Sequence, residues 1–257
     1  MGFENDSKKS LTTIETAFEI IEHIMAVDGA RVSDVSDQLD LPRSTVHNYL
    51  GTLHQQGYLV KSGEQYRIGL RFLSLGGHAA ANQPGYQLLR TKVNQVANET
   101  HERAQCIVEE DGKGFYIYEM TGSDAVRTDV QVGKQVHLHT ISAGKAILAH
   151  LPDARVEKIV DYWGLPERTE HTITSRDELL AELETIREQG YAFNDEERIV
   201  GQRAVGVPVL DEHGEIITSL SVSGPKNRLK GDWFREEIPD ILLGVANEIE
   251  LNLQFSD

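Results

Sequence analysis

The chain has 257 residues, 39% of them hydrophobic, which is enough for two compact domains that each bury a core. No signal-peptide-like apolar segment opens the chain, and no apolar run approaches the ~18 residues of a membrane span. We therefore expect a cytoplasmic protein with no membrane partner. The single cysteine, Cys106, excludes an internal disulfide and a multi-cysteine zinc site, so we expect it to be a small buried hydrophobe.

The net charge of −16 argues against a nucleic-acid partner, but the charge is unevenly distributed. Residues 81–257 carry 31 acidic and 18 basic side chains, whereas residues 1–80 carry 10 and 7. Between residues 41 and 80 the only acidic residue is Glu64. Four basic residues accompany it: Arg43, Lys61, Arg67 and Arg71. A local basic face is therefore available for DNA, while the overall acidity suits either a protein that stays soluble at high salt or an ordinary acidic protein.

Two helices are predicted before residue 40. Thr12 and Glu15 have the T-x-x-E spacing of a capping box, and Asp28-Gly29 ends the first helix. Apolar residues recur along it with helical period: Ile14, Ala17, Phe18, Ile21, Ile24 and Met25. Ser33 is expected to cap a second, short helix.

A third helix is expected from Pro42 to Gln56, with Gly57 as its stop. Its buried stripe is predicted to be Val46, Leu50 and Leu53. Four short, uncharged residues project on the opposite side: Ser44, Asn48, Gly51 and Gln55. Such a ridge suits the major groove and favours a helix-turn-helix over the alternative of a generic helical bundle.

Two short strands, residues 58–60 and 65–68, flank a Gly-containing turn and predict a hairpin that serves as a wing. Lys61 and Arg67 on this hairpin, with Arg43, are expected to neutralise phosphates. Ser44, Thr45 and Asn48 are placed for base edges, and Asn48 suits bidentate reading of adenine.

The runs at residues 41–47 (LPRSTVH) and 66–76 (YRIGLRFLSLG) resemble the DNA-binding half of IclR-type regulators. The resemblance adds His47 to the expected DNA-binding residues. Family members usually carry Arg after this histidine, where this chain has Asn48, so the operator sequence of relatives is not transferred.

The rest of the chain is predicted to form an α+β domain. Residues 70–84 form a linker helix with a break, and a helix follows over residues 86–100. Strands are expected at residues 104–109 and 114–120, separated by the turn 110–113, in a mainly antiparallel sheet.

Residues 139–149 (HTISAGKAILA) join a strand end, a small-residue turn and a helix start, which leaves backbone N–H groups near Ala143 and Gly144 available to a ligand oxygen. The segment lacks the glycine and Ser/Thr of a Walker A loop. Ser142 and Lys145 match the S-x-x-K spacing of some serine hydrolases, without the companion motifs. His137 and His139 are expected to alternate on a strand, with no clear third ligand, so no metal is predicted.

The same segment resembles the G-K-A-x-L-A hallmark of the IclR family, and the similarity continues through residues 169–173, 183–197, 207–209 and 220–225. It implies a GAF-like effector domain. The effector-binding positions that the resemblance implies are Ala143, Gly144, Asn194, Ala204, Ser221 and Ser223. Relatives that bind small keto acids have Asp at position 194 and Cys at position 204, so a different ligand, such as a sugar acid or hydroxy acid, is expected.

The leading hypothesis is an IclR-type transcriptional regulator, with a winged helix-turn-helix at 1–69, a linker helix at 70–84 and an effector domain at 85–257. It would bind palindromic double-stranded DNA as a homodimer or dimer of dimers, with a small molecule altering its affinity, and with neither cofactor nor enzymatic activity. Two alternatives stay open. One is a serine hydrolase using Ser142 and Lys145, and the other is a constitutive DNA-binding protein without an effector.

Overall fold

The computed structural model describes residues 11–125 and 131–255, which divide into two compact units between Asn82 and Gln83. No helix in the described part of the chain combines the length and apolar character needed to cross a membrane.

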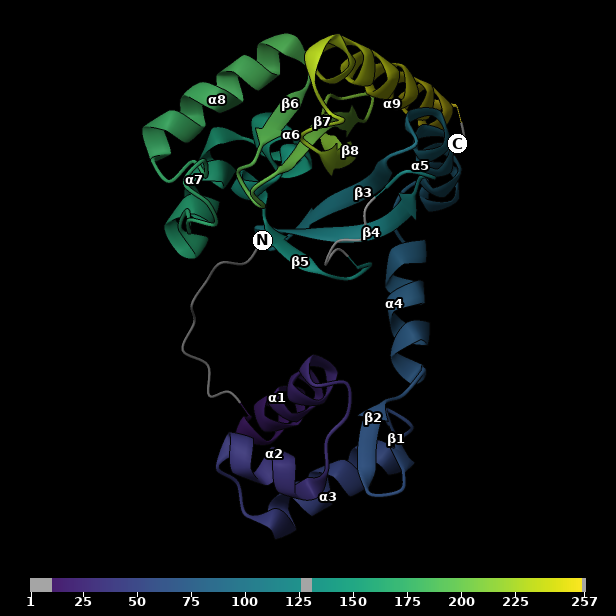
Figure 1. Ribbon diagram of the computed structural model, residues 1–257, viewed down its shortest axis with the longest axis vertical. Helices are drawn as coiled ribbons and strands as arrows, with labels where there is room; N and C mark the ends of the chain where they lie inside the picture. Colours follow the sequence, from purple (N-terminus) through teal and green to yellow (C-terminus); the bar gives the residue numbers. More distant parts are fainter. Residues whose placement is uncertain (1–10, 126–130, 256–257) are drawn as a thin grey trace. The chain divides into compact units, whose positions relative to one another are not determined.

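The first unit is a winged helix-turn-helix (Figure 1). It comprises α1 (Thr12–Ala26), α2 (Val32–Leu39), α3 (Arg43–Gln55), the antiparallel hairpin β1 (Leu59–Ser62) and β2 (Gln65–Ile68), and α4 (Arg71–Ala81). Val46 and Leu50 of α3 are fully buried and Leu53 packs against them, as the sequence predicts. They share a core with Ile20, Ile24, Val35, Leu59 and Tyr66.

Two expectations about the first helices are wrong. Thr12 does not cap α1, since it is the first helical residue and Leu11 precedes it without a side-chain cap. In α2 the cap position is Arg31 rather than Ser33, and the backbone N–H of Arg31 donates to Asp34 Oδ2 at 2.9 Å. A carboxylate at the third helical position is a stronger acceptor than a hydroxyl, so it sets the helix start.

The inward face of α1 also differs from the expected stripe. Ile20 and Ile24 are its buried residues, whereas Ile14, Phe18 and Met25 are exposed. Period alone does not separate an apolar face that enters this core from one that stays on the surface.

The second unit is an α+β domain around one six-stranded, fully antiparallel sheet in the order β5-β4-β3-β8-β7-β6, which confirms the predicted fold class. Its strands are β3 (Arg103–Glu110), β4 (Lys113–Thr121), β5 (Gln135–His137), β6 (Ala192–Asp195), β7 (Gln202–Leu210) and β8 (Ile216–Pro225). Its helical elements are α5 (Tyr86–Thr100), η1 (Leu138–Thr140), α6 (Ser142–His150), α7 (Asp153–Trp163), α8 (Arg176–Gln189), the π-helical turn η2 (Trp233–Glu237) and α9 (Ile238–Gln254).

Helices cover both faces of this sheet (Figure 1). α5 and α9 pack on one face, against alternate β3 residues such as Ala104 and Cys106, while α6, α7 and α8 pack on the other, where Ile107 points. Cys106 is fully buried, as expected. The sheet therefore lies between two apolar layers, and polar side chains within it are withdrawn from water.

Two local predictions in this unit need correction. Lys113 belongs to β4 instead of the preceding turn, because Asp111 and Gly112 alone, both with positive φ, complete the connection from β3. His137 and His139 do not alternate on one strand, because β5 ends at His137 and His139 lies in the 3-10 turn η1.

Candidate functional site

The outer face of α3 is exposed and polar. Arg43, Ser44, His47 and Asn48 are exposed, and Thr45 is half-buried. Among these residues, only Arg43 carries a permanent charge. Because Val46 and Leu50 anchor the opposite face, this helix presents hydrogen-bonding side chains on a rigid support, which suits the reading of base edges.

The β1–β2 hairpin adds two exposed cations beside this helix. Lys61 Nζ lies 5.2 Å from the ring centroid of Tyr66, its cross-strand partner, and Arg67 pairs with Val60 across the same hairpin. A Cβ on Gly29 would lie only 3.0 Å from Arg67 Cγ, so the Arg67 stem packs close to the α1–α2 connection. The hairpin thus holds positive charge at defined positions.

The second unit contains a small polar cavity at the centre of the sheet, with a volume of about 20 Å³. That volume is enough for about one water molecule. Its lining residues come from several strands, the start of α6 and the β6–β7 connection: Gln105, Tyr116, Ile141, Ser142, Asn194, Arg198, Gln202, Ala204, Ser221 and Ser223.

Four of the six expected effector positions, Asn194, Ala204, Ser221 and Ser223, line this cavity. Both serines are buried, and they bond to Gln105, a residue that sequence reasoning missed. Ser221 Oγ donates to Gln105 Oε1 at 2.9 Å, and Gln105 Nε2 donates to Ser223 Oγ at 2.9 Å. The available signal was a lone Gln among the apolar residues 104–108 of β3.

Asn194 is buried and partly engaged, because its Nδ2 donates to the Thr140 carbonyl oxygen at 2.7 Å. Since an amide nitrogen carries two hydrogens and the side-chain oxygen is a separate acceptor, one donor and the acceptor are left for other partners.

Ala143 and Gly144 lie in the first turn of α6, where small size is needed for packing. A Cβ on Gly144 would come within 2.2 Å of the Leu138 carbonyl oxygen, and a Cβ on Gly206 would come within 2.5 Å of the Ala143 nitrogen. The cavity wall at this turn comes instead from the neighbouring Ser142, whose Oγ is buried and has no hydrogen-bond partner in the described part of the chain.

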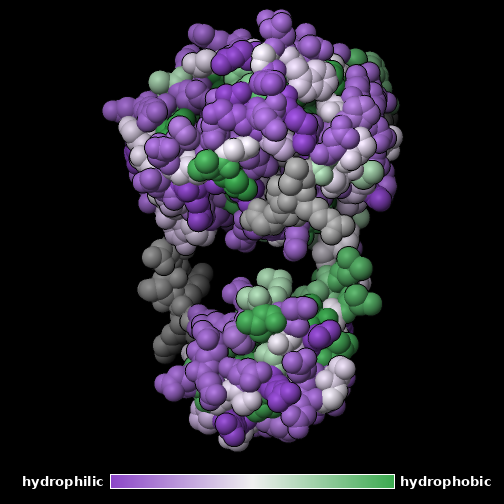
Figure 2. Space-filling view, viewed as in Figure 1, coloured by the Kyte–Doolittle hydropathy of each residue, from purple (hydrophilic) through white to green (hydrophobic). Residues whose placement is uncertain are grey.

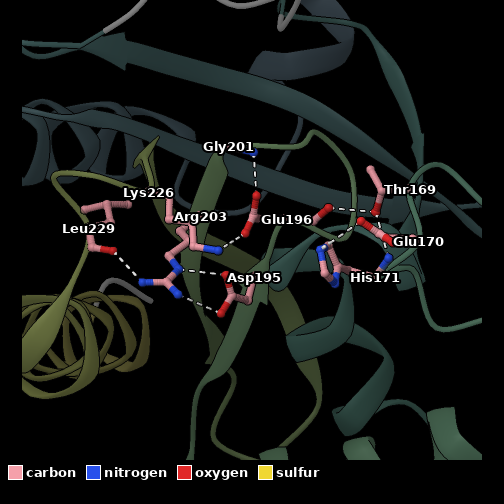
Figure 3. A network of polar contacts seen from close by, with 9 residues as sticks. All are labelled: Thr169, Glu170, His171, Asp195, Glu196, Gly201, Arg203, Lys226 and Leu229. Atoms are coloured by element: carbon pink, nitrogen blue, oxygen red, sulfur yellow. Dashed lines mark hydrogen bonds and ion pairs between the residues drawn. The ribbon is translucent and has the colours of Figure 1, made fainter.

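A polar network fixes the β6–β7 edge beside the cavity (Figure 3). Asp195 accepts two hydrogen bonds from Arg203, at 2.7 and 2.9 Å, and this hydrogen bonding lowers the pKa of the Asp195 carboxyl. Glu196 accepts from the Gly201 N–H at 2.7 Å and pairs with Lys226. The network holds the cross-strand pair Asn194 and Ala204 in place.

Arg198 extends from the same connection to the cavity, where it donates to the Tyr116 hydroxyl at 3.0 Å. A cation and a phenol therefore stand at the wall next to the buried hydroxyl groups.

Lys145, one turn after Ser142, is fully buried and paired with two carboxylates. Its Nζ lies 2.8 Å from Glu182 Oε1 and 2.8 Å from Glu197 Oε1. Burial raises the pKa of Glu197, and the charge of Lys145 partly offsets the effect. No hydrogen bond joins Lys145 to Ser142 among the described residues.

An exposed polar helix beside a basic wing, followed in the chain by a second domain, defines a DNA-binding transcriptional regulator of the winged helix-turn-helix class. The protein-family model described as the IclR helix-turn-helix domain matches residues 13–63 of this chain. A second family model, described as bacterial transcriptional regulator IclR C-terminal, matches residues 78–251. The chain belongs to the IclR family of transcriptional regulators.

Individual relatives are similar to this protein over nearly the whole chain. The probable HTH-type transcriptional regulator ArcR of Halobacterium salinarum is 33% identical over 254 residues, covering 97% of each protein. The crystal structure of the Thermotoga maritima IclR superposes with a TM-score of 0.80 at 27% identity, covering 96% of this chain and 100% of that one. An IclR homolog from Microbacterium hydrocarbonoxydans, solved in complex with 4-hydroxybenzoate, shares the fold with a TM-score of 0.77 at 24% identity, covering 93% and 97% of the two chains.

Proposed function

We propose that this regulator binds a palindromic operator and that a small polar metabolite, bound in the polar cavity of the second unit, changes its affinity for DNA. The observation that carries the effector part is the Ser142 hydroxyl, which is buried at the cavity wall without a hydrogen-bond partner among the described residues. Buried polar groups are nearly always hydrogen-bonded, so an unpaired hydroxyl beside seven further polar side chains suits a polar ligand.

For DNA, the proposal assigns phosphate contacts to Arg43, Lys61 and Arg67. Ser44, Thr45, His47 and Asn48, on or next to the exposed face of α3, are assigned to the major groove. The exposure of six of these seven residues, with Thr45 half-buried, supports the assignment.

The proposed effector is a sugar acid or a related hydroxy acid. Its hydroxyl groups match Ser221, Ser223 and Gln105, and the positive charge of Arg198 favours a carboxylate. Asn194 supports an acid as well, because an amide does not repel a carboxylate as an Asp would. A cavity of about 20 Å³ does not admit such a molecule, so binding requires the wall to open.

The two functions would be linked through a dimer. α4 has no buried residue, and Figure 2 shows the hydrophobic surface over this helix. Leu73 in α4 is 72% exposed, and Leu70, the residue just before α4, is 84% exposed. Exposed apolar area of this kind commonly marks a protein interface. A ligand that favours one arrangement of paired effector domains would bias the spacing of the two recognition helices, and hence their fit to half-sites.

The hydrolase alternative finds less support in the geometry. A serine–lysine pair needs the amine within hydrogen-bonding reach of the hydroxyl. Lys145 is instead held between Glu182 and Glu197, and its charge compensates theirs. This arrangement suits a structural lysine.

A thermal-shift screen of sugar acids and hydroxy acids tests the effector site. A ligand at 100 times its Kd should stabilise the folded protein by about 2.7 kcal/mol. Ser142→Ala should remove that shift while keeping the melting temperature of the free protein close to wild type, because its hydroxyl has no partner among the described residues. Ser221→Ala should also remove the shift, at a cost of about 1–3 kcal/mol in stability, because Gln105 Oε1 loses its donor. Retention of the full shift in both variants would place the ligand elsewhere.

A further inference from the structure

A second and larger cavity, of about 420 Å³, lies in the same unit and is lined by basic side chains. Five of its lining residues carry cationic or imidazole groups: Lys113, Lys134, His137, Arg168 and Arg198. No acidic residue is among the described residues that line it. In a chain of net charge −16, such a concentration of basic groups requires a physical reason.

Lys113 is the clearest anomaly, because it is 8% exposed and forms no ion pair with a carboxylate among the described residues. Its Nζ lies 3.9 Å from the centroid of the Trp163 ring, and 3.0 and 2.8 Å from Nδ1 and Nε2 of His137. A buried cation without a countercharge is costly, and the aromatic rings compensate only part of that cost.

Arg168 is a second cation that lines the same cavity. It is exposed, and in the described part of the chain no carboxylate pairs with its guanidinium group. Three buried or half-buried cations elsewhere in this unit are neutralised, Lys145 by Glu197, Arg203 by Asp195 and Arg228 by Glu102. Lys113 and Arg168 thus share one cavity, and neither has a carboxylate partner within residues 11–125 and 131–255.

Burial and neighbouring positive charges both favour the neutral forms of the titratable groups around this cavity. Burial, together with the charges of Lys113 and Arg168, lowers the pKa of His137 to about 4. Burial lowers the pKa of His139 to about 4 as well, and burial and Arg168 lower the pKa of Lys113. An anion in the cavity would relieve this repulsion.

We propose that this cavity binds a phosphate group, carried by a small phosphorylated metabolite or present as inorganic phosphate. A phosphate offers about two negative charges and three strong acceptor oxygens in one compact group, whereas a carboxylate offers one charge and two oxygens. The ammonium of Lys113 and the planar fork of Arg168 are donors that suit phosphate. The volume also lies in the range of small-molecule sites, so it accommodates more than the phosphate itself.

This site is distinct from the polar cavity, since the described residues that line the two cavities have only Arg198 in common. The proposal therefore does not depend on the effector assigned to Ser142, Ser221 and Ser223, and the two can fail separately.

Isothermal titration calorimetry tests the proposal. The full chain is titrated separately with glucose 6-phosphate, inorganic phosphate and glucose. We expect saturable binding of one or both phosphates and no heat from glucose. Tighter binding of the ester would identify a phosphorylated metabolite as the ligand, and equal or tighter binding of inorganic phosphate would identify the free ion. Absence of binding by both phosphates up to about 10 mM, a range in which weak sites are still detected, would overturn the proposal.

Variants locate the site. Arg168→Gln and Lys113→Met should each weaken phosphate binding by about tenfold or more, because each removes a charge-assisted hydrogen bond. Lys158→Gln, on the exposed side of α7, removes the same charge away from the cavity and should bind as wild type does. Equal affinities for Arg168→Gln and Lys158→Gln would show non-specific attraction and contradict the assignment. Because Arg168 is exposed, this comparison holds even if Lys113→Met does not fold.

Discussion

Gln105 and Ser221 face each other across β3 and β8, and the serine hydroxyl donates to the glutamine side-chain oxygen at 2.9 Å. Gln105 also donates to Ser223, so one amide satisfies both buried hydroxyls. The polar cavity is therefore organised around a residue that contributes both a donor and an acceptor.

Replacing Gln105 with Leu should destabilise the second unit, because Ser221 and Ser223 would both lose their partners. Each unsatisfied buried group costs about 1–3 kcal/mol. Urea denaturation measures the change, with Gln87→Leu on the exposed side of α5 as the control. A similar urea midpoint for both variants would mean that the two hydroxyls find other partners.

Replacing Lys145 with Met should cost about 3–5 kcal/mol at neutral pH, because it leaves the Glu197 carboxylate buried without its countercharge. Glu182→Gln is the milder control, since the side chain of Glu182 is 32% exposed.

The loss of stability in Lys145→Met, relative to wild type, should become smaller as the pH falls. Burial already raises the pKa of Glu197, so the folded state binds this proton more tightly than the unfolded state does. The free energy of unfolding therefore falls as the pH rises from the ordinary pKa of a glutamate to the raised pKa of Glu197 in the folded protein. Lys145 lowers the pKa of Glu197, so removing Lys145 extends this pH range upward. Chemical denaturation of the variant at several pH values tests this, and a deficit independent of pH would contradict the assigned cause.

Replacing Arg43 or Lys61 with Ala should weaken operator binding and reduce the slope of log affinity against log salt by about one unit for each lost phosphate contact. Asn48→Ala should instead alter preference at one base pair, by about 1–3 kcal/mol. Fluorescence anisotropy with single-base operator variants distinguishes the two effects. If Asn48→Ala weakened binding to every operator variant by the same factor, the base-reading role of Asn48 would be contradicted.

Replacing Leu73 with Glu should shift the protein from dimer to monomer, because it places a charge on the exposed apolar surface of α4. Sedimentation velocity at micromolar concentration measures the change. Lys158→Gln serves as a surface control. A wild-type protein that sedimented as a monomer at the salt used for DNA binding would refute the proposed interface.

Elements with strong local signals were predictable from the sequence. The helix expected over residues 86–100 is α5 (Tyr86–Thr100), and its stripe Leu89, Val93 and Val96 is buried. Helical periodicity and a glycine before the first turn predict a helix from local sequence, and runs of β-branched residues do the same for a strand. The position of α1 in its core was not fixed in this way, because Phe18 continues the apolar pattern while lying on the surface.

The two cavities form where segments distant in the sequence come into contact, so the spacing of residues along the chain did not predict them. Lys113, His137 and Arg168 come from β4, β5 and the connection after α7, and none belongs to a recognisable motif. Gln105 was likewise hidden in an apolar run. By contrast, Ser221 and Ser223 were expected only through family resemblance, because alternating serines in a strand often face solvent.

The most direct test of the central claim is the affinity for operator DNA, measured by fluorescence anisotropy with and without a ligand found by the thermal-shift screen. The wild-type protein should bind a palindromic operator, and saturating ligand should change its Kd by about 5–150-fold, the usual range of allosteric coupling. The Ser142→Ala/Ser221→Ala double variant should bind the same DNA without responding to the ligand. DNA binding that no ligand alters would identify a constitutive DNA-binding protein, and an unchanged response in the double variant would contradict the polar cavity as the effector site.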